Sequence, residues 1–101
     1  MPLNDATLEA RLAEIAASGD TLTYGALARE LGWRVSELTD ALERLMEADA
    51  AAAAPQRAAL LEARLGNGLP APGFFLKLAE LGLTPEDPAA FVAETRARLR
   101  R

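Results

Sequence analysis

The sequence predicts a single, mainly helical domain of the α+β class, with three helices, a short β element and two C-terminal helices in that order. The chain has 101 residues, the length of one domain. Alanine and leucine dominate, and the only β-branched aliphatic residues are Ile15, Val35 and Val92. This bias favours helices over strands. Glycine and proline clusters interrupt the helical pattern and set the order of the elements.

Residues 1–55 are expected to form a three-helix core. The first helix begins near Asn4 or Asp5, because either side chain can cap free backbone amides. It stops in the Ser-Gly-Asp sequence at residues 18–20. Apolar residues repeat along it at spacings of four and three, which is typical of one buried helical face: Leu8, Leu12 and Ile15.

The second helix lies within TLTYGALARELG at residues 21–32, with Thr23 as N-cap and Gly32 as the left-handed C-terminal residue. Ser36 is expected to cap the third helix, which ends in an alanine-rich run terminated by Pro55. The buried positions predicted for these two helices keep the same periodicity: Tyr24, Leu27, Ala28, Leu31, Leu38, Leu42, Leu45 and Met46.

Residues 56–73 are expected to form a short β hairpin, or wing, and a loop. Leu61, Ala63 and Leu65 alternate with charged residues, as in a half-buried strand, although intrinsic propensity would make residues 58–65 a helix. The turn sequence at residues 66–68, Gly-Asn-Gly, favours the strand.

Residues 74–101 are expected to hold two helices, the first ended by Gly82 and the second capped by Asp87. Pro88 suits the first position of the second helix, where no amide is needed. Their apolar faces are Phe74, Phe75, Leu78 and Leu81 in the first helix, and Phe91, Val92, Thr95 and Leu99 in the second.

The loop GNGLPAPGFF, residues 66–75, contains three glycines before a helix, as some phosphate-binding loops do. Pro70 and Pro72 lack two of the amides that such a site would use. We therefore interpret the loop as a corner in which Gly73 lets the chain bend and place two phenylalanines on the core. Where Leu69 and the prolines are exposed, it would also be a partner-facing edge.

The composition excludes several kinds of site. The chain has no cysteine and no histidine, and Lys77 is its single lysine. Thiolate chemistry is therefore excluded, and the usual general base and commonest metal ligand are missing. We expect no enzymatic activity, no metal, no cofactor and no small-molecule substrate. No apolar run is long enough to span a membrane, and the N-terminus lacks the basic residues of a targeting peptide, so we expect a cytoplasmic protein.

The order of the elements is that of a winged helix-turn-helix. The stretch TLTYGALARELG resembles the start of the winged helix in the alkylguanine-DNA alkyltransferase and alkyltransferase-like family, at Thr23, Tyr24, Gly25, Ala28 and Gly32. That family continues with Pro-Cys-His-Arg, or has tryptophan in place of the cysteine, whereas this chain reads Pro-Gln-Arg at residues 55–57. Alkyl transfer requires the missing thiolate and is not implied.

A fuller resemblance covers residues 22–82 and is to a group of small bacterial proteins of winged-helix type. It rests on TYGALA at residues 23–28, LTDAL at 38–42, DAAAAAP at 49–55, RAAL at 57–60 and GLPAPGFF at 68–75. The resemblance implies a winged-helix-like architecture and no particular activity.

Charge disfavours, but does not exclude, DNA binding. Residues 1–50 carry ten acids and four arginines, and the chain has a net charge of −4. The expected outer face of the third helix is acidic, which opposes entry into a DNA groove: Glu37, Asp40, Glu43, Arg44 and Glu47.

We therefore expect a non-enzymatic regulatory or protein-interaction module that binds a protein partner or associates with itself. The alternative is nucleic-acid binding through the helix-turn-helix and wing. Trp33 has two interpretations, a stacking residue or part of the core. The candidate contacts are Arg29, Trp33, Arg34, Ser36, Arg57, Arg64, Leu69, Pro70 and Pro72.

Overall fold

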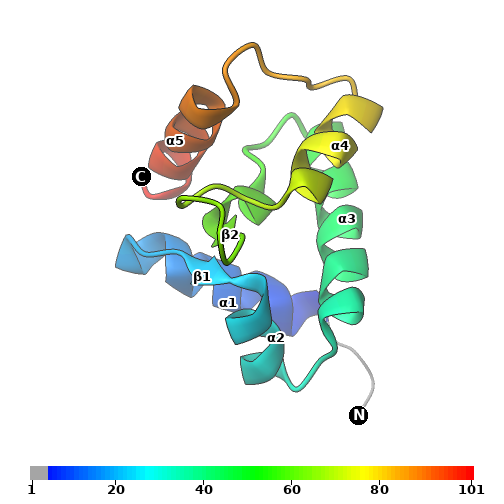
Figure 1. Ribbon diagram of the computed structural model, residues 1–101, viewed down its shortest axis with the longest axis vertical. Helices are drawn as coiled ribbons and strands as arrows, with labels where there is room; N and C mark the ends of the chain where they lie inside the picture. Colours follow the sequence, from blue (N-terminus) through cyan, green and yellow to red (C-terminus); the bar gives the residue numbers. More distant parts are fainter. Residues whose placement is uncertain (1–4) are drawn as a thin grey trace.

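Helices make up most of the protein, and the expectation of a mainly helical α+β chain is confirmed (Figure 1). The computed structural model describes residues 5–101, so Asn4, the other proposed start of the first helix, lies outside the described residues. The elements are α1 (Asp5–Ser18), β1 (Leu22–Thr23), α2 (Tyr24–Leu31), α3 (Val35–Ala51), the 3₁₀ helix η1 (Arg57–Leu60), β2 (Leu61–Glu62), α4 (Pro72–Glu80) and α5 (Pro88–Leu99).

Several helix ends lie where their local sequence places them. The Thr23 hydroxyl accepts a hydrogen bond from the Ala26 amide at 3.2 Å and caps α2. Gly32 follows α2 in the left-handed region, at a φ of 72°. The Asp87 carboxylate accepts from the Ala90 amide at 3.1 Å and caps α5. These predictions are confirmed because each depends on neighbouring residues alone.

The prediction that Ser36 caps α3 is wrong. The N-cap is Arg34, and Ser36 lies inside the first turn of the helix. The Glu37 carboxylate reaches back to accept a hydrogen bond from the Arg34 amide at 2.8 Å. This acidic residue in the first turn satisfies a free amide and suits the helix dipole, so no serine cap is needed.

α3 also ends earlier than predicted, at Ala51 rather than against Pro55. Ala53 adopts a left-handed conformation at a φ of 52°. The Ala54 amide then donates to the carbonyl of Asp49 at 2.9 Å, which closes the helix end. The chain therefore turns away before the proline is reached.

The expected β hairpin is also wrong. Residues 57–60 form η1, where Ala58, Ala59 and Leu60 are all buried, and successive burial of this kind does not fit a half-buried strand. β2 covers only two residues and pairs in parallel with β1, Leu22 opposite Leu61 and Thr23 opposite Glu62. No other strand pairing is found in residues 5–101, so the winged-helix expectation is not confirmed.

η1 lies at the centre of the core, in contact with α1, α3 and α5 (Figure 1). α1 supplies the leucine stripe predicted from the sequence, and Leu8 and Leu12 are fully buried. The Arg96 guanidinium of α5 donates to the carbonyl of Ala59 at 2.7 Å and so ties the last helix to η1. The other completely buried large side chains are Ile15, Leu27, Leu38, Leu60, Leu61, Leu78 and Val92.

In residues 5–101, no helix is both long enough and apolar enough to cross a membrane.

Candidate interaction surface

The segment after β2 is a tight turn held by three backbone hydrogen bonds. The Ala63 amide donates to the carbonyl of Leu69 at 2.8 Å, the Gly66 amide to that of Ala63 at 3.0 Å, and the Leu69 amide to that of Gly66 at 2.9 Å. Asn67 and Gly68 adopt positive φ angles of 52° and 87°, as expected for this turn. The turn therefore presents its side chains on a fixed backbone.

A hydrogen bond from a distant element fixes the end of the loop. The Ala71 amide donates to the Tyr24 hydroxyl of α2 at 3.0 Å. α4 begins at Pro72, and Gly73 lies inside its first turn without a positive φ. The expected bend at Gly73 and the boundary between residues 73 and 74 are therefore wrong, because Pro72 already has the φ that a first helical position needs.

The two phenylalanines of α4 both contact the core, but they line different hollows on the surface of the protein. Phe74 is buried in the core, whereas Phe75 is half-buried. Their rings are 5.2 Å apart and edge to face, a favourable aromatic arrangement. α4 thus separates two apolar surfaces.

The first surface is an open hollow that we call the proline-loop patch. Leu65 is 93% exposed and Leu76 is 69% exposed at this surface. Of the loop residues proposed as a partner-facing edge, Pro72 is exposed, Leu69 is half-buried and Pro70 is buried. The patch is lined by Ala63, Leu65, Gly66, Leu69, Pro70, Pro72, Phe75 and Leu76, all uncharged.

The second surface, which we call the α3–α4 groove, has a volume of about 200 Å³. Val35 stands at it with half of its surface exposed. Glu43 is its only charged lining residue and makes no ion pair within residues 5–101, whereas Glu47, one turn later, is paired with Lys77 at 3.0 Å. Its lining residues are Tyr24, Val35, Thr39, Leu42, Glu43, Met46, Ala58, Ala71, Gly73 and Phe74.

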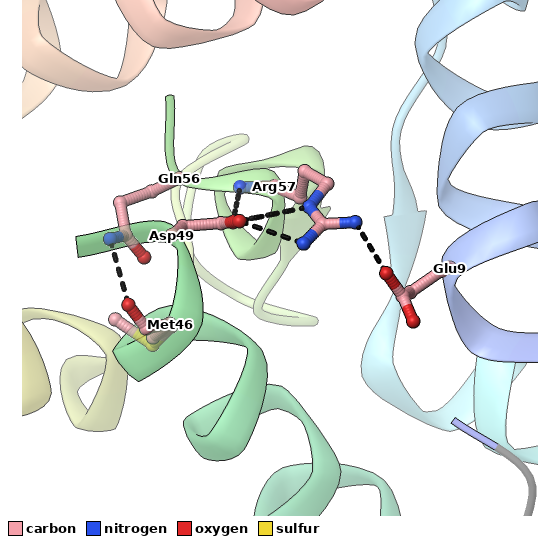
Figure 2. A network of polar contacts seen from close by, with 5 residues as sticks. All are labelled: Glu9, Met46, Asp49, Gln56 and Arg57. Carbon is pink, nitrogen blue, oxygen red and sulfur yellow. Dashed lines mark hydrogen bonds and ion pairs between the residues drawn. The ribbon is translucent and has the colours of Figure 1, made fainter. Parts of the chain in front are cut away.

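Arg57, a candidate contact, belongs to an internal network instead (Figure 2). Its guanidinium donates to the Asp49 carboxylate at 2.7 and 3.1 Å and to Glu9 at 2.9 Å, and its amide donates to Asp49 at 3.0 Å. The Asp49 side chain is only 5% exposed. The hydrogen bond with Asp49 raises the pKa of Arg57 above its usual value. The arginine therefore joins η1 to α3 and α1.

Beside this network lies a second buried polar residue, Gln56 (Figure 2). Its amide nitrogen donates to the carbonyl of Met46 at 3.1 Å. Its Oε1 atom is buried without a hydrogen-bond partner in the described residues. Through the hydrogen bond to Met46, Gln56 closes the end of α3.

The remaining charged candidates are exposed. Arg29 lies on α2, Arg34 in the α2–α3 turn and Arg64 in the loop after β2, and none makes an ion pair within residues 5–101. Figure 1 shows that the α2–α3 turn and the loop after β2 are at different places on the molecule. Trp33 is half-buried against the core, and Ser36 is exposed.

Sequence reasoning missed Leu76 and Val35 as exposed apolar residues, and it placed Leu65 on the buried face of a strand. Glu43 was expected on the outer face of the third helix, but not at the edge of a groove. The exposed leucine beside a Gly-Asn-Gly turn was the available signal. Within residues 5–101, no group of three His, Cys, Asp or Glu residues could hold a metal ion. A scan against protein-family models finds no match, and neither does a search of curated proteins or one of solved structures.

Proposed function

We propose that this protein is a non-enzymatic protein-interaction module of regulatory type, which uses the proline-loop patch to contact its partner. The exposure of Leu65 and Leu76, 93% and 69%, carries the proposal. Leucines exposed together around an apolar hollow favour contact with another macromolecule, because burial removes apolar surface from water.

The backbone of the patch supports this function. The turn is fixed by hydrogen bonds between Ala63, Gly66 and Leu69, and Tyr24 holds the Ala71 amide. A surface ordered in this way loses little conformational entropy when a partner binds. Binding energy from the apolar contacts is therefore retained.

Nucleic-acid binding through Arg29, Arg34 and Arg64 is the alternative, and it has less support. Arg57 is held by two carboxylates and contributes no free positive charge. α3 presents exposed Asp40 and Glu47 where a recognition helix would meet phosphates.

Photo-crosslinking in growing cells tests the proposal. A benzophenone amino acid replaces Leu65 in one variant and exposed Ala10 of α1 in the control. We expect discrete protein adducts from position 65 and none of these from position 10. Equal adducts from both positions, or adducts only to nucleic acid from position 65, would contradict the proposal.

A titration with duplex DNA at low salt, followed by NMR amide shifts, tests the alternative. We expect no saturable shifts at Arg34 or Arg64. Shifts at both residues that fade as salt is raised would instead favour nucleic-acid binding, since phosphate contacts are strongly salt-dependent.

A further inference from the structure

A projecting feature and a hollow on the two sides of α4 complement each other. The projection consists of Arg64 and Leu65 at the tight turn after β2, both exposed, with Leu65 at 93%. The hollow is the α3–α4 groove, which has apolar walls and one carboxylate, Glu43. An apolar side chain beside a cation thus faces solvent on one surface, and an apolar groove beside an anion on the other.

We propose that the partner is a second copy of this chain, in which Leu65 of one copy enters the α3–α4 groove of the other and Arg64 pairs with Glu43. This inference rests on the proposed function, whose partner it names. It brings Leu65 of the proline-loop patch and the α3–α4 groove together in one contact.

The size of the groove fits the side chain. A cavity of roughly 150 Å³ lined by apolar side chains can hold a benzene-sized molecule. The α3–α4 groove has about 200 Å³ and is lined by Leu42, Met46 and Phe74 among others. It therefore has room for one leucine side chain. The turn that carries Leu65 is already held by backbone hydrogen bonds, so it does not have to become ordered when Leu65 binds.

The carboxylate of Glu43 favours a segment that carries a cation, as Arg64 beside Leu65 does, over a purely apolar segment. Glu43 and Arg64 each lack an ion-pair partner in residues 5–101, whereas neighbouring Glu47 is already neutralised by Lys77. A carboxylate in an apolar groove favours a cation that arrives with the apolar group. Such a pair sets orientation and partner choice more than it adds affinity.

α4 carries residues of both surfaces. Gly73 and Phe74 line the groove, whereas Pro72, Phe75 and Leu76 line the proline-loop patch. In the proposed dimer the two copies are related by a two-fold axis, so that each Leu65 enters the groove of the other copy and the assembly closes as a dimer instead of growing into a chain. The small contact predicts a weak dimer, with a dissociation constant on the order of 10 μM.

Sedimentation velocity of the full chain, from low micromolar to millimolar concentration, tests the inference. We expect a monomer–dimer equilibrium in the native protein. L65D should weaken dimerisation by about tenfold or more, since a buried anchor is replaced by a charge. R64E and E43R should each weaken it by about tenfold, and the double variant R64E/E43R should restore it to within about threefold of the native protein.

R98E is the matched control, because Arg98 is exposed on α5 outside both surfaces, and it should leave the dimer unchanged. Circular dichroism confirms that each variant is folded. A native protein that stays monomeric at millimolar concentration would overturn the inference, as would a dimer unaffected by L65D or not rescued by the double reversal. If the protein stays monomeric but position 65 still gives adducts to another protein in cells, the partner is not a second copy of this chain. The proposed function would then stand without this inference.

Discussion

Replacing Asp49 with alanine should destabilise the fold more than any exposed acid-to-alanine change on α3. Asp49 has a side chain only 5% exposed and accepts hydrogen bonds from both the guanidinium and the amide of Arg57. Its removal leaves a partly buried cation and a backbone donor without their main acceptor. The variant therefore removes the side-chain hydrogen bonds that join α3 to η1.

The magnitude follows from the surroundings of the pair. Removing one partner of a fully buried pair costs about 3–5 kcal/mol. Arg57 keeps its contact with Glu9 at 2.9 Å and its side chain is 30% exposed, so water offsets part of this loss. We expect D49A to lower the free energy of unfolding by about 2–4 kcal/mol, a large share of the roughly 5–15 kcal/mol typical of a domain.

Urea unfolding followed by circular dichroism measures the effect. D40A is the control, since Asp40 is an exposed acid of the same helix, and it should change the unfolding free energy by less than about 0.5 kcal/mol. E9Q, which weakens only the more exposed contact of Arg57, should cost less than about 1 kcal/mol. If D49A unfolds within about 0.5 kcal/mol of D40A, the argument from the buried pair is refuted.

Three other predictions concern Tyr24 and two glycines. Y24F should cost about 1 kcal/mol in urea unfolding and speed hydrogen exchange at the Ala71 amide, which loses its acceptor; unchanged exchange would contradict this. Burial raises the pKa of Tyr24 above its model-compound value of 10.0, so absorbance titration should show a midpoint above that value. Tyr24 ionises at a lower pH in the unfolded chain than in the folded protein. The free energy of unfolding therefore falls as the pH rises past about 10. G66A should destabilise the fold by about 1–3 kcal/mol, because the new Cβ would lie 2.7 Å from the carbonyl oxygen of Leu69. G25A should stabilise it by up to about 1 kcal/mol, because Gly25 lies in a helix with open space around it. Similar melting temperatures for the two variants would refute the comparison.

The sequence predicts those parts of the fold that depend on near neighbours. Thr23 and Asp87 cap helices through hydrogen bonds three residues away, so a short stretch contains all the information. The β element could not be predicted in the same way. η1 is buried by contacts with α1, α3 and α5, and the two-residue strands are too short to show a periodicity.

The candidate site was predicted in part. The proline loop was identified, but Leu65 was assigned to a buried strand face because the alternation of residues 61–65 suggested one. In the structure the strand ends at Glu62 and the chain then turns, so Leu65 does not continue the buried face of Leu61. Arg57 is a candidate contact by sequence, but Asp49 continues the apolar stripe of α3 after Leu42 and Met46. An acid at such a core-facing position indicates that a cation lies nearby, and that cation is Arg57.

The parallel pairing of β1 and β2 has a kinetic consequence. The paired residues are separated in sequence by α2, α3 and η1, whereas antiparallel neighbours need only a short turn. Helices form from local contacts. Joining distant segments has a larger loop-closure entropy cost, and this cost comes before the contacts between the segments stabilise the chain. We therefore expect the two strands to meet after the folding transition state. Weakening that junction, through Thr21 and its 2.7 Å hydrogen bond to Glu62, should hasten unfolding and leave the folding rate unchanged. The β1–β2 junction therefore contributes to the lifetime of the folded state and not to the rate at which that state forms.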